Sequence, residues 1–422
     1  MFFKQRCLLF FTLFAITTLL KPVWAEYRQE YPLPTPSIPD SLGVNIHFTD
    51  PAPNRLDLLA AAGFKWIRMD FSWSDTERER GVYNFSDYDR LMEGLRRYHI
   101  RALFILDYGN DLYQHGAPTT PEARSAFCKW VAAAVTHFRH QGILWEMWNE
   151  PNIGFWQPHP DVNQYADLAL AVGQTIRRVA PDEWYIGPGM SGMDFGFLEG
   201  CFKRGLLQYW DAVSFHPYRD SAPETAAPDF EHVRQLIQQY APPGKSVPIL
   251  ASEWGYSELY PGLDLEKQSR YIVREFLSNI ANGLLLTIWY DWHDDGLDPH
   301  NAEHHFGTVF NNYQPKSTYL AAQTLARTLD GFVFRKRISL GSPDDYCLLF
   351  THGDQARLAV WTTEALPHPV QIPQLTGKVV VIGLTGARFV VTAGGNGLNF
   401  YLTNEPQYLV PTHNTAQSFG TE

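Results

Sequence analysis

The strongest constraint on the fold is a rhythm between residues 40 and 330, where short apolar runs alternate eight times with longer amphipathic segments. Runs rich in β-branched and aromatic residues predict strands, and a period near 3.6 predicts helices. A strand–helix unit repeated eight times predicts a parallel sheet closed into a (β/α)8 barrel. The alternative is a doubly wound open sheet, but no Gly-x-Gly-x-x-Gly turn follows the first strand. We predict strands at 42–47, 65–70, 101–107, 143–148, 184–187, 212–216, 247–252 and 284–290, and helices at 55–62, 88–98, 121–140, 163–179, 195–206, 230–240, 266–280 and 317–329.

The first 25 residues are typical of a secretory signal peptide. A basic start precedes an apolar stretch over 7–20, and residues 23–25 (VWA) form a cleavage site of the usual kind. We therefore expect an exported protein, periplasmic or secreted, with no stable membrane span once residues 1–25 are removed. An uncleaved membrane anchor is the alternative. Residues 26–39 are proline-rich and predict an extended lead-in.

Beyond the barrel region the sequence pattern changes. From 331 to 411, turn sequences such as GGNG at 394–397 separate short β-type runs, which we predict at 332–340, 346–351, 358–362, 379–384, 389–392 and 398–402. These runs predict a small antiparallel β-sandwich that follows the barrel. The polar residues 412–422 predict a loose tail.

Charge and cysteine content exclude several classes of protein. The net charge is −11, whereas nucleic acids and anionic membranes are bound through basic patches, so we expect no nucleic-acid partner. One of the four cysteines lies in the signal segment, and the others form no Cys-x-x-Cys pair. The sequence therefore predicts neither a disulfide scaffold nor a zinc ribbon.

Two glutamates follow predicted strands. Residues 142–152 read GILWEMWNEPN, and because Pro151 cannot extend a strand ladder, Asn149 and Glu150 belong at the carboxyl end of the fourth strand. Glu253 follows the seventh strand directly. In a barrel both would lie on the rim that carries active sites. Cleavage of an acetal needs one carboxyl group to protonate the leaving oxygen and another to attack or activate water. A glutamate that merely caps the next loop is the alternative for Glu150.

These motifs resemble the clan-A retaining glycoside hydrolases, and most of all glycoside hydrolase family 39 and related bacterial enzymes that cleave exopolysaccharides. The similarity covers roughly residues 40–330. It is carried by WNEP at 148–151, SEWG at 252–255, FKWIR at 64–68, FSW at 71–73, ILDYGN at 105–110, HPY at 216–218 and WYDWHDDG at 289–296.

The resemblance implies a role for each matching residue. Glu150 would be the general acid and then the general base, and Glu253 the nucleophile. Asn149 would hydrogen-bond the sugar 2-hydroxyl, and Tyr218 would donate its hydroxyl to Glu253. Retention requires the two carboxyl groups to lie about 5–5.5 Å apart. We also expect burial of Glu150 among Trp148, Trp156 and their neighbours to raise its pKa.

Other polar residues have supporting roles with simpler alternatives. We expect Arg68 to orient a catalytic carboxylate, although a surface ion pair is possible from sequence alone. Glu146 is better explained as a buried partner of an arginine or histidine than as a third catalyst. His47 and His216 are expected to line the sugar subsite, with a buried core histidine as the alternative for His47.

Aromatic residues after the strands are expected to stack on sugar rings. Trp292 is the preferred platform. The loop after the eighth strand is rich in Asp and His, but it lacks His-Glu-x-x-His spacing, so we expect it to contact sugar hydroxyls and we expect no metal or cofactor. Further candidates for stacking or support, some of which will belong to the core, are Trp73, Asp107, Tyr108, Tyr113, Trp148, Trp156 and Trp254.

The sequence therefore predicts an exported retaining glycosidase whose partner is a polysaccharide or oligosaccharide substrate. We expect it to cut a β-linked bacterial or plant glycan internally. An exo-acting enzyme similar to β-xylosidases is one alternative. A non-catalytic carbohydrate-binding protein on a barrel scaffold is another, although binding alone needs no acid–nucleophile pair.

Overall fold

The computed structural model describes residues 28, 30–412 and 419. The predicted signal peptide at 1–25 and nearly all of the predicted tail at 412–422 lie outside the described residues. Within the described part of the chain, no helix is long and apolar enough to cross a membrane.

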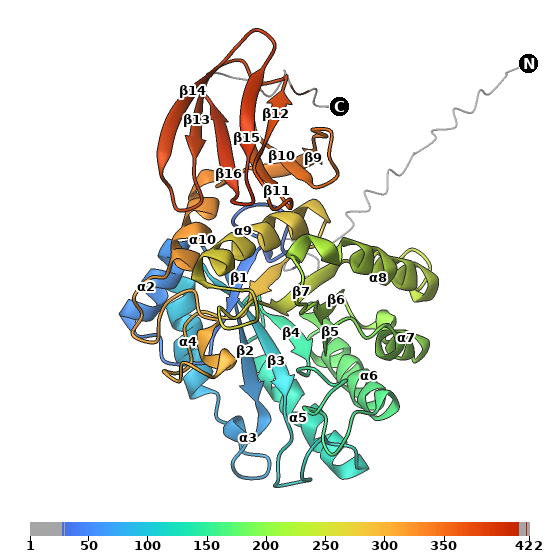
Figure 1. The fold of residues 1–422 in the computed structure, drawn as a ribbon. Coiled ribbons are helices and arrows are strands. Elements are labelled where there is room, and N and C mark those ends of the chain that lie inside the picture. The colour runs from blue at the N-terminus through green and yellow to red at the C-terminus, as the bar shows by residue number, and fades with distance from the viewer. Residues whose placement is uncertain (1–27, 29, 413–418, 420–422) are drawn as a thin grey trace, which may run out of the picture.

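Eight parallel strands form a closed barrel in chain order, because β1 pairs with β2 on one side and with β8 on the other (Figure 1). The predicted barrel and the β-sandwich that follows it are confirmed. The strands are β1 (Leu42–Asn45), β2 (Trp66–Ser72), β3 (Arg101–Asp107), β4 (Leu144–Met147), β5 (Trp184–Ser191), β6 (Ala212–His216), β7 (Ile249–Trp254) and β8 (Thr287–Trp289).

Helices surround the barrel, and local sequence signals set where several of them begin. Asp161 and Asp264 accept backbone hydrogen bonds at the starts of α6 and α9, and Thr120 does the same for α5, whose first residue is proline. The helices are α2 (Pro53–Ala62), α3 (Trp73–Thr76), α4 (Ser86–Arg97), α5 (Pro121–His137), α6 (Val162–Val179), α7 (Phe195–Lys203), α8 (Ala227–Tyr240), α9 (Leu265–Ala281) and α10 (Ser317–Thr328).

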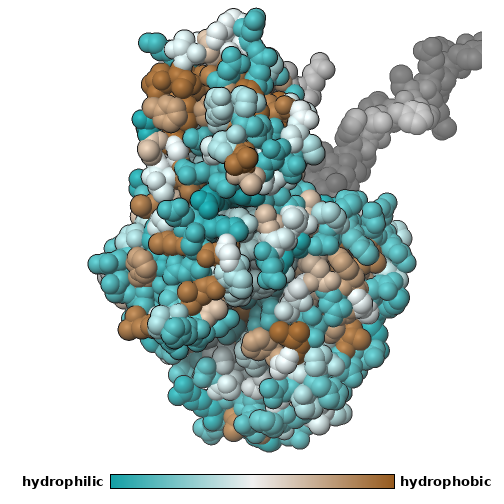
Figure 2. Space-filling model, in the orientation of Figure 1, coloured by the Kyte–Doolittle hydropathy of each residue, from teal (hydrophilic) through white to brown (hydrophobic). Residues whose placement is uncertain are grey.

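The chain after α10 forms the β unit, which packs on the barrel as a six-stranded and a two-stranded antiparallel sheet. Trp361 joins the two parts, because its indole N–H donates to Glu224 of the barrel over 2.7 Å. Figure 2 shows hydrophobic residues gathered on the outer part of this unit, where Figure 1 places β13 and β14. Its strands are β9 (Val333–Arg337), β10 (Asp345–His352), β11 (Gln355–Thr362), β12 (His368–Ile372), β13 (Gly377–Ile382), β14 (Arg388–Ala393), β15 (Leu398–Leu402) and β16 (Gln407–Pro411).

Candidate active site

The two glutamates singled out from the sequence meet at one rim of the barrel. Glu253 is the second-last residue of β7, and Glu150 comes three residues after the end of β4. An oxygen of the Glu150 carboxyl group lies within 4.8 Å of an oxygen of the Glu253 carboxyl group. Retaining glycosidases hold their carboxyl groups about 5–5.5 Å apart, whereas inverting enzymes need about 6.5–9.5 Å to admit a water. The spacing therefore fits retention.

The backbone around Glu150 adopts conformations that most residues avoid. Trp148 has φ 68° and Glu150 has φ 46°, both in the left-handed region, where non-glycine residues are strained by about 1–3 kcal/mol each. The Glu150 N–H donates to the Gly189 carbonyl over 2.9 Å and so holds the loop against β5. Gly189 has φ 59°, and a Cβ there would lie 3.0 Å from the Trp148 carbonyl oxygen. The close approach of β5 to this loop therefore requires glycine at 189.

Arg68 lies at the centre of the buried charges beneath the rim. It comes from the first half of β2 and is 1% exposed, so it is not a surface ion pair. Its Nε donates to Glu146 over 2.8 Å, its Nη1 to Glu253 over 2.5 Å and its Nη2 to the Asn149 side-chain oxygen over 2.9 Å. Arg68 thus orients one of the two rim glutamates, and Glu146 is its buried partner.

His216 connects this network to Glu150, and its neighbours define its tautomer. The Arg68 guanidinium can only donate, so His216 Nε2, which lies 3.2 Å from Arg68 Nη2, must accept. The proton of the neutral ring is therefore on Nδ1, which donates to Glu150 Oε1 over 3.0 Å. The two rim glutamates consequently have different partners: Glu150 faces an imidazole N–H, and Glu253 faces a guanidinium.

Tyr218 completes the surroundings of Glu253. Its hydroxyl donates to Glu253 Oε1 over 2.8 Å, while Arg68 donates to Oε2. Both oxygens of Glu253 thus accept a hydrogen bond, as the oxygens of a carboxylate can. Burial and the neighbouring charge of Glu253 raise the pKa of Tyr218 well above its usual range, so the phenol keeps its proton.

The expectation that burial would raise the pKa of Glu150 is wrong for the free enzyme. Burial does act in that direction, but hydrogen bonds from His216 and Ser191 and the charge of Arg68 outweigh it, and the pKa of Glu150 is lowered. Trp148 and Trp156, whose burial the expectation rested on, are packed around this loop at 1% and 0% exposure. A donor on Nδ1 of His216 is a tertiary contact that no local pattern around Glu150 contains.

Both glutamates open into a cleft of about 690 Å³. Seven of the residues expected from the sequence line this cleft: His47, Arg68, Tyr108, Asn149, Glu150, Tyr218 and Glu253. Ten further residues line the cleft, and none of them was given an individual role from the sequence. Three lie in barrel strands (Asn45, Asp70 and Ser191), and Tyr290 lies in the motif at 289–296. The others belong to loops, including the loop after the eighth strand that was expected to contact sugar hydroxyls: Phe155, Arg219, Asp220, Tyr260, Glu303 and Phe306. The only signal for Phe155 in the sequence is an aromatic residue shortly after the Asn-Glu-Pro motif.

Most of the tryptophans expected to stack on sugars are in the core instead. Trp292, the preferred platform, is 1% exposed and packs edge-on against Phe64, so that expectation is wrong. Trp156 is also buried and contacts Trp148 at 4.9 Å between ring centroids. Both side chains belong to the main hydrophobic core, together with apolar residues of the surrounding helices. Trp73 and Trp254 are likewise fully buried.

Asp107, one of the candidates for stacking or support, does not line the cleft itself. It ends β3, is fully buried, and neither of its carboxyl oxygens finds a donor among the described residues. Burial and then the charge of Asp70 raise the pKa of Asp107 well above its usual range. A protonated Asp107 can donate to Asp70, which lines the cleft. The adjacent Tyr108 lines the cleft directly.

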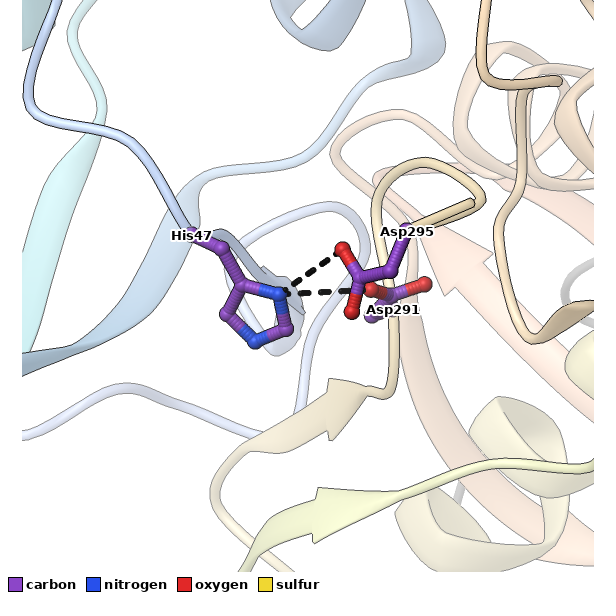
Figure 3. Close-up of side chains that lie close together, drawn as sticks. All are labelled: His47, Asp291 and Asp295. Carbon is purple, nitrogen blue, oxygen red and sulfur yellow. Dashed lines mark hydrogen bonds and ion pairs between the residues drawn. The ribbon is translucent and has the colours of Figure 1, made fainter. Parts of the chain in front are cut away.

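His47 lines the cleft and is not a core histidine, because 37% of its side chain is exposed. Figure 3 shows the ring facing two acids of the loop after β8: Nδ1 lies 3.0 Å from Asp295 and 3.8 Å from Asp291. Burial opposes protonation of His47, but the hydrogen bond and charge of Asp295 raise its pKa.

The three residues in Figure 3 are close enough to bind a metal ion, yet their hydrogen bonds favour an imidazole N–H that donates to Asp295. Asn45 lies between Arg68 and His47, with its oxygen toward the guanidinium and its NH2 donating to His47 Nε2 over 2.9 Å. Nε2 is thus an acceptor, which leaves the proton of the neutral ring on Nδ1, facing Asp295. A metal on Nδ1 would have to displace that proton and reverse the Asn45 amide.

Comparison with known proteins agrees with this geometry. Residues 35–296 match the family described as cellulase (glycosyl hydrolase family 5). A β-xylosidase of Geobacillus stearothermophilus is 27% identical over 313 residues, and the alignment covers 61% of this chain and 61% of that protein. The chain therefore spans about three fifths of the length of this relative.

Solved structures resemble the chain over most of its length. A family 39 glycoside hydrolase from the gut symbiont Bacteroides cellulosilyticus superposes with a TM-score of 0.79 at 25% identity, covering 89% of this chain and 82% of that one. A family 39 β-xylosidase from Caulobacter crescentus shares the fold with a TM-score of 0.66 at 19% identity, over 88% and 96% of the two chains. The chain belongs to the family of that cellulase match, glycosyl hydrolase family 5, and it also resembles enzymes of family 39.

Proposed function

We propose that the protein cuts β-glycosidic bonds within a polysaccharide by double displacement, with Glu150 as the acid/base and Glu253 as the nucleophile. The observation that carries the assignment is the pair of carboxyl groups within 4.8 Å, each with a different hydrogen-bond partner. Two carboxyl groups in different surroundings can hold different protonation states when substrate is bound.

In the first step Glu253 attacks the anomeric carbon while Glu150 gives a proton to the leaving glycosidic oxygen, which produces a covalent glycosyl-enzyme. In the second step Glu150 takes a proton from a water that attacks the same carbon, and Glu253 is released. Asn149 positions the sugar by donating its amide N–H to the 2-hydroxyl, because its oxygen is already engaged by Arg68. No cofactor is needed for either step.

The shape of the cleft supports internal cleavage. The main hollow adjoins a second hollow of about 250 Å³, because Tyr108 and Phe155 belong to the walls of both. An enzyme that removes single terminal sugars needs a cleft closed at one end. We accordingly favour a polymer chain, either a bacterial exopolysaccharide or a plant-type glycan, that passes through the site.

An exo-acting β-xylosidase is the second candidate. It is favoured by the names of two relatives, the Geobacillus and Caulobacter β-xylosidases. The two functions differ in their products: an exo-acting enzyme releases only monosaccharides, whereas an endo-acting enzyme releases oligosaccharides.

We also propose that the protein is exported to the periplasm or beyond, on the basis of its first 25 residues. Expression of the full chain in a Gram-negative host, with cell fractionation and N-terminal sequencing, tests this proposal. Processing near residue 25 supports export, and an unprocessed chain in the cytoplasm contradicts it.

Product analysis by mass spectrometry tests the enzymatic proposal. Wild type and Glu253→Gln are incubated with β-glucans, xylans, mannans and bacterial exopolysaccharides. Oligosaccharides from one polymer that are absent with Glu253→Gln establish an endo-acting enzyme and its substrate class. Monosaccharides alone favour the second candidate. Binding to a polymer without any product would contradict both and favour a carbohydrate-binding protein.

A further inference from the structure

A second hollow adjoins the catalytic cleft and has its own aromatic wall. It encloses about 250 Å³ between the loops that follow β3 and β4. The loop after β4 contributes the Phe155 ring to its wall, with 48% of the residue exposed. The hollow is lined by Tyr108, Gly109, Asp111, His115, Gly116, Ala117, Trp148, Gly154, Phe155 and Gln157.

The Phe155 ring is held in place from one side. Tyr108 lies nearly parallel to it, with 5.9 Å between ring centroids and 18° between the planes. Trp148 meets Tyr108 edge-on at 5.6 Å and donates its indole N–H to the Phe155 carbonyl over 3.2 Å. The aromatic wall is therefore preorganised and continuous with the strand end that carries Glu150.

Glycines keep the hollow open and its two loops together. The Ala117 N–H donates to the Gln157 carbonyl over 3.1 Å and so ties one loop to the other. A Cβ on Gly109 would lie 2.0 Å from the Gly116 carbonyl oxygen, and Gly116 itself has φ 76°. Nothing lies within 4 Å of the Cβ position of Gly154, which faces open space.

The chemistry of the hollow fits a neutral sugar. Pyranose rings present an apolar C–H face that packs on aromatic rings and hydroxyl groups around their edge. The exposed Asp111 and His115, joined through Nδ1 and Oδ1 at 3.1 Å, offer acceptors and donors to such hydroxyls. None of the described residues that line the hollow is lysine or arginine, so nothing there selects an anionic ligand.

We propose that this hollow is a remote sugar subsite, in which a neutral pyranose unit of the bound chain packs on Phe155 while its hydroxyl groups meet Asp111 and His115. The proposal rests on the proposed function, because the occupant is part of the polymer held in the catalytic cleft. Its support is the continuity of the two hollows through Tyr108 and Phe155. At about 250 Å³ the site suits one sugar ring rather than a protein surface.

Chain-length dependence tests the proposal. For wild type, Phe155→Ala and Phe155→Trp, kcat/KM is measured on p-nitrophenyl β-glycosides and on β-1,4-linked xylo-, cello- and manno-oligosaccharides of increasing length. We expect Phe155→Ala to lower the ratio of kcat/KM on the longest oligosaccharide to that on the aryl glycoside about tenfold. Phe155→Trp should retain the ratio because it keeps an aromatic face.

Phe389→Ala is the matched control, since Phe389 is 50% exposed on β14 of the β unit and should leave the ratio unchanged. An unchanged ratio in Phe155→Ala would overturn the subsite while leaving the catalytic pair in place. An enzyme that cleaves aryl glycosides but no oligosaccharide would also overturn it. Loss of every activity in wild type, or full activity in Glu253→Gln, would instead contradict the proposed function.

Discussion

The carboxyl end of the barrel and the interior of the β unit are both shielded from water, but they are built from different groups. Beneath the barrel rim, Arg68, Glu146 and His216 are each at most 1% exposed. The β unit buries side chains such as Leu358, Val360 and Val381 in a core of hydrocarbon. Burial of apolar surface stabilises a fold by about 25 cal/mol per Å², whereas burial of a charge costs stability unless a partner compensates it.

This difference shows what each region contributes. A hydrocarbon core stabilises its unit and has no chemistry of its own. The barrel end keeps buried charges, although apolar residues in such places often stabilise a protein equally well. Its Arg68 and His216 donate to the two carboxyl groups that line the cleft, those of Glu253 and Glu150. We infer that the charged network is maintained for the reaction, and the following changes should separate the two regions.

The largest effect is expected for Glu253→Gln. The amide cannot form a glycosyl-enzyme, so kcat should fall by at least about a thousandfold, while the circular dichroism spectrum stays native. Glu93→Gln on the surface of α4, where the side chain is 59% exposed, is the matched control and should retain full activity. A Glu253→Gln enzyme with normal turnover would remove Glu253 from the mechanism.

Arg68→Met should cost about 3–5 kcal/mol in free energy of unfolding, because it leaves buried Glu146 without its partner. Urea denaturation measures this loss. The corresponding change in the β unit, Arg357→Met, removes a half-buried arginine that contacts a backbone carbonyl and the Phe332 ring, so it should cost less. Equal losses in both variants would mean that the barrel charges are no more critical than an ordinary arginine.

Leu358→Ala in the central strand β11 should lower the free energy of unfolding by about 2–4 kcal/mol through loss of packing. Since the site lies in the barrel, kcat measured on the folded enzyme should stay within about twofold of wild type. Thermal denaturation and steady-state kinetics check the two halves of this prediction. A large fall in kcat would show that the β unit takes part in catalysis.

The smallest effect concerns pH. Glu150 must be protonated to act as an acid, and His216 lowers its pKa, so the basic limb of kcat/KM should lie at acidic pH. His216→Gln keeps an acceptor near Nε2 but loses the Nδ1 donor, which should raise the pKa of Glu150 and move this limb upward by about one pH unit. His216→Asn, which places an N–H near Nδ1, should keep the limb close to that of wild type. A limb that moves downward in His216→Gln would contradict this account.

The periodicity of the sequence was enough to predict the barrel. The predicted strands at 101–107 and 212–216 have the same bounds in the structure. Each is a short apolar run that ends at a polar residue. In the β unit, β12 and β16 were missed. The segment of β12 reads HPVQI and that of β16 reads QYLVP, and the prolines and polar residues in both hide the alternation.

Local sequence also placed Glu150 and Glu253 at strand ends, because parallel strands in one barrel must share a rim. Only the tertiary structure decided which side chains would reach the cleft. Trp292 and Trp156 turned into the core, while Phe155 stayed exposed beside Tyr108. The pKa of Glu150 likewise depends on His216, which lies 66 residues away in the chain. Strand order follows from patterns along the chain, but burial and electrostatics depend on which distant loops pack together, and that is determined by the whole fold.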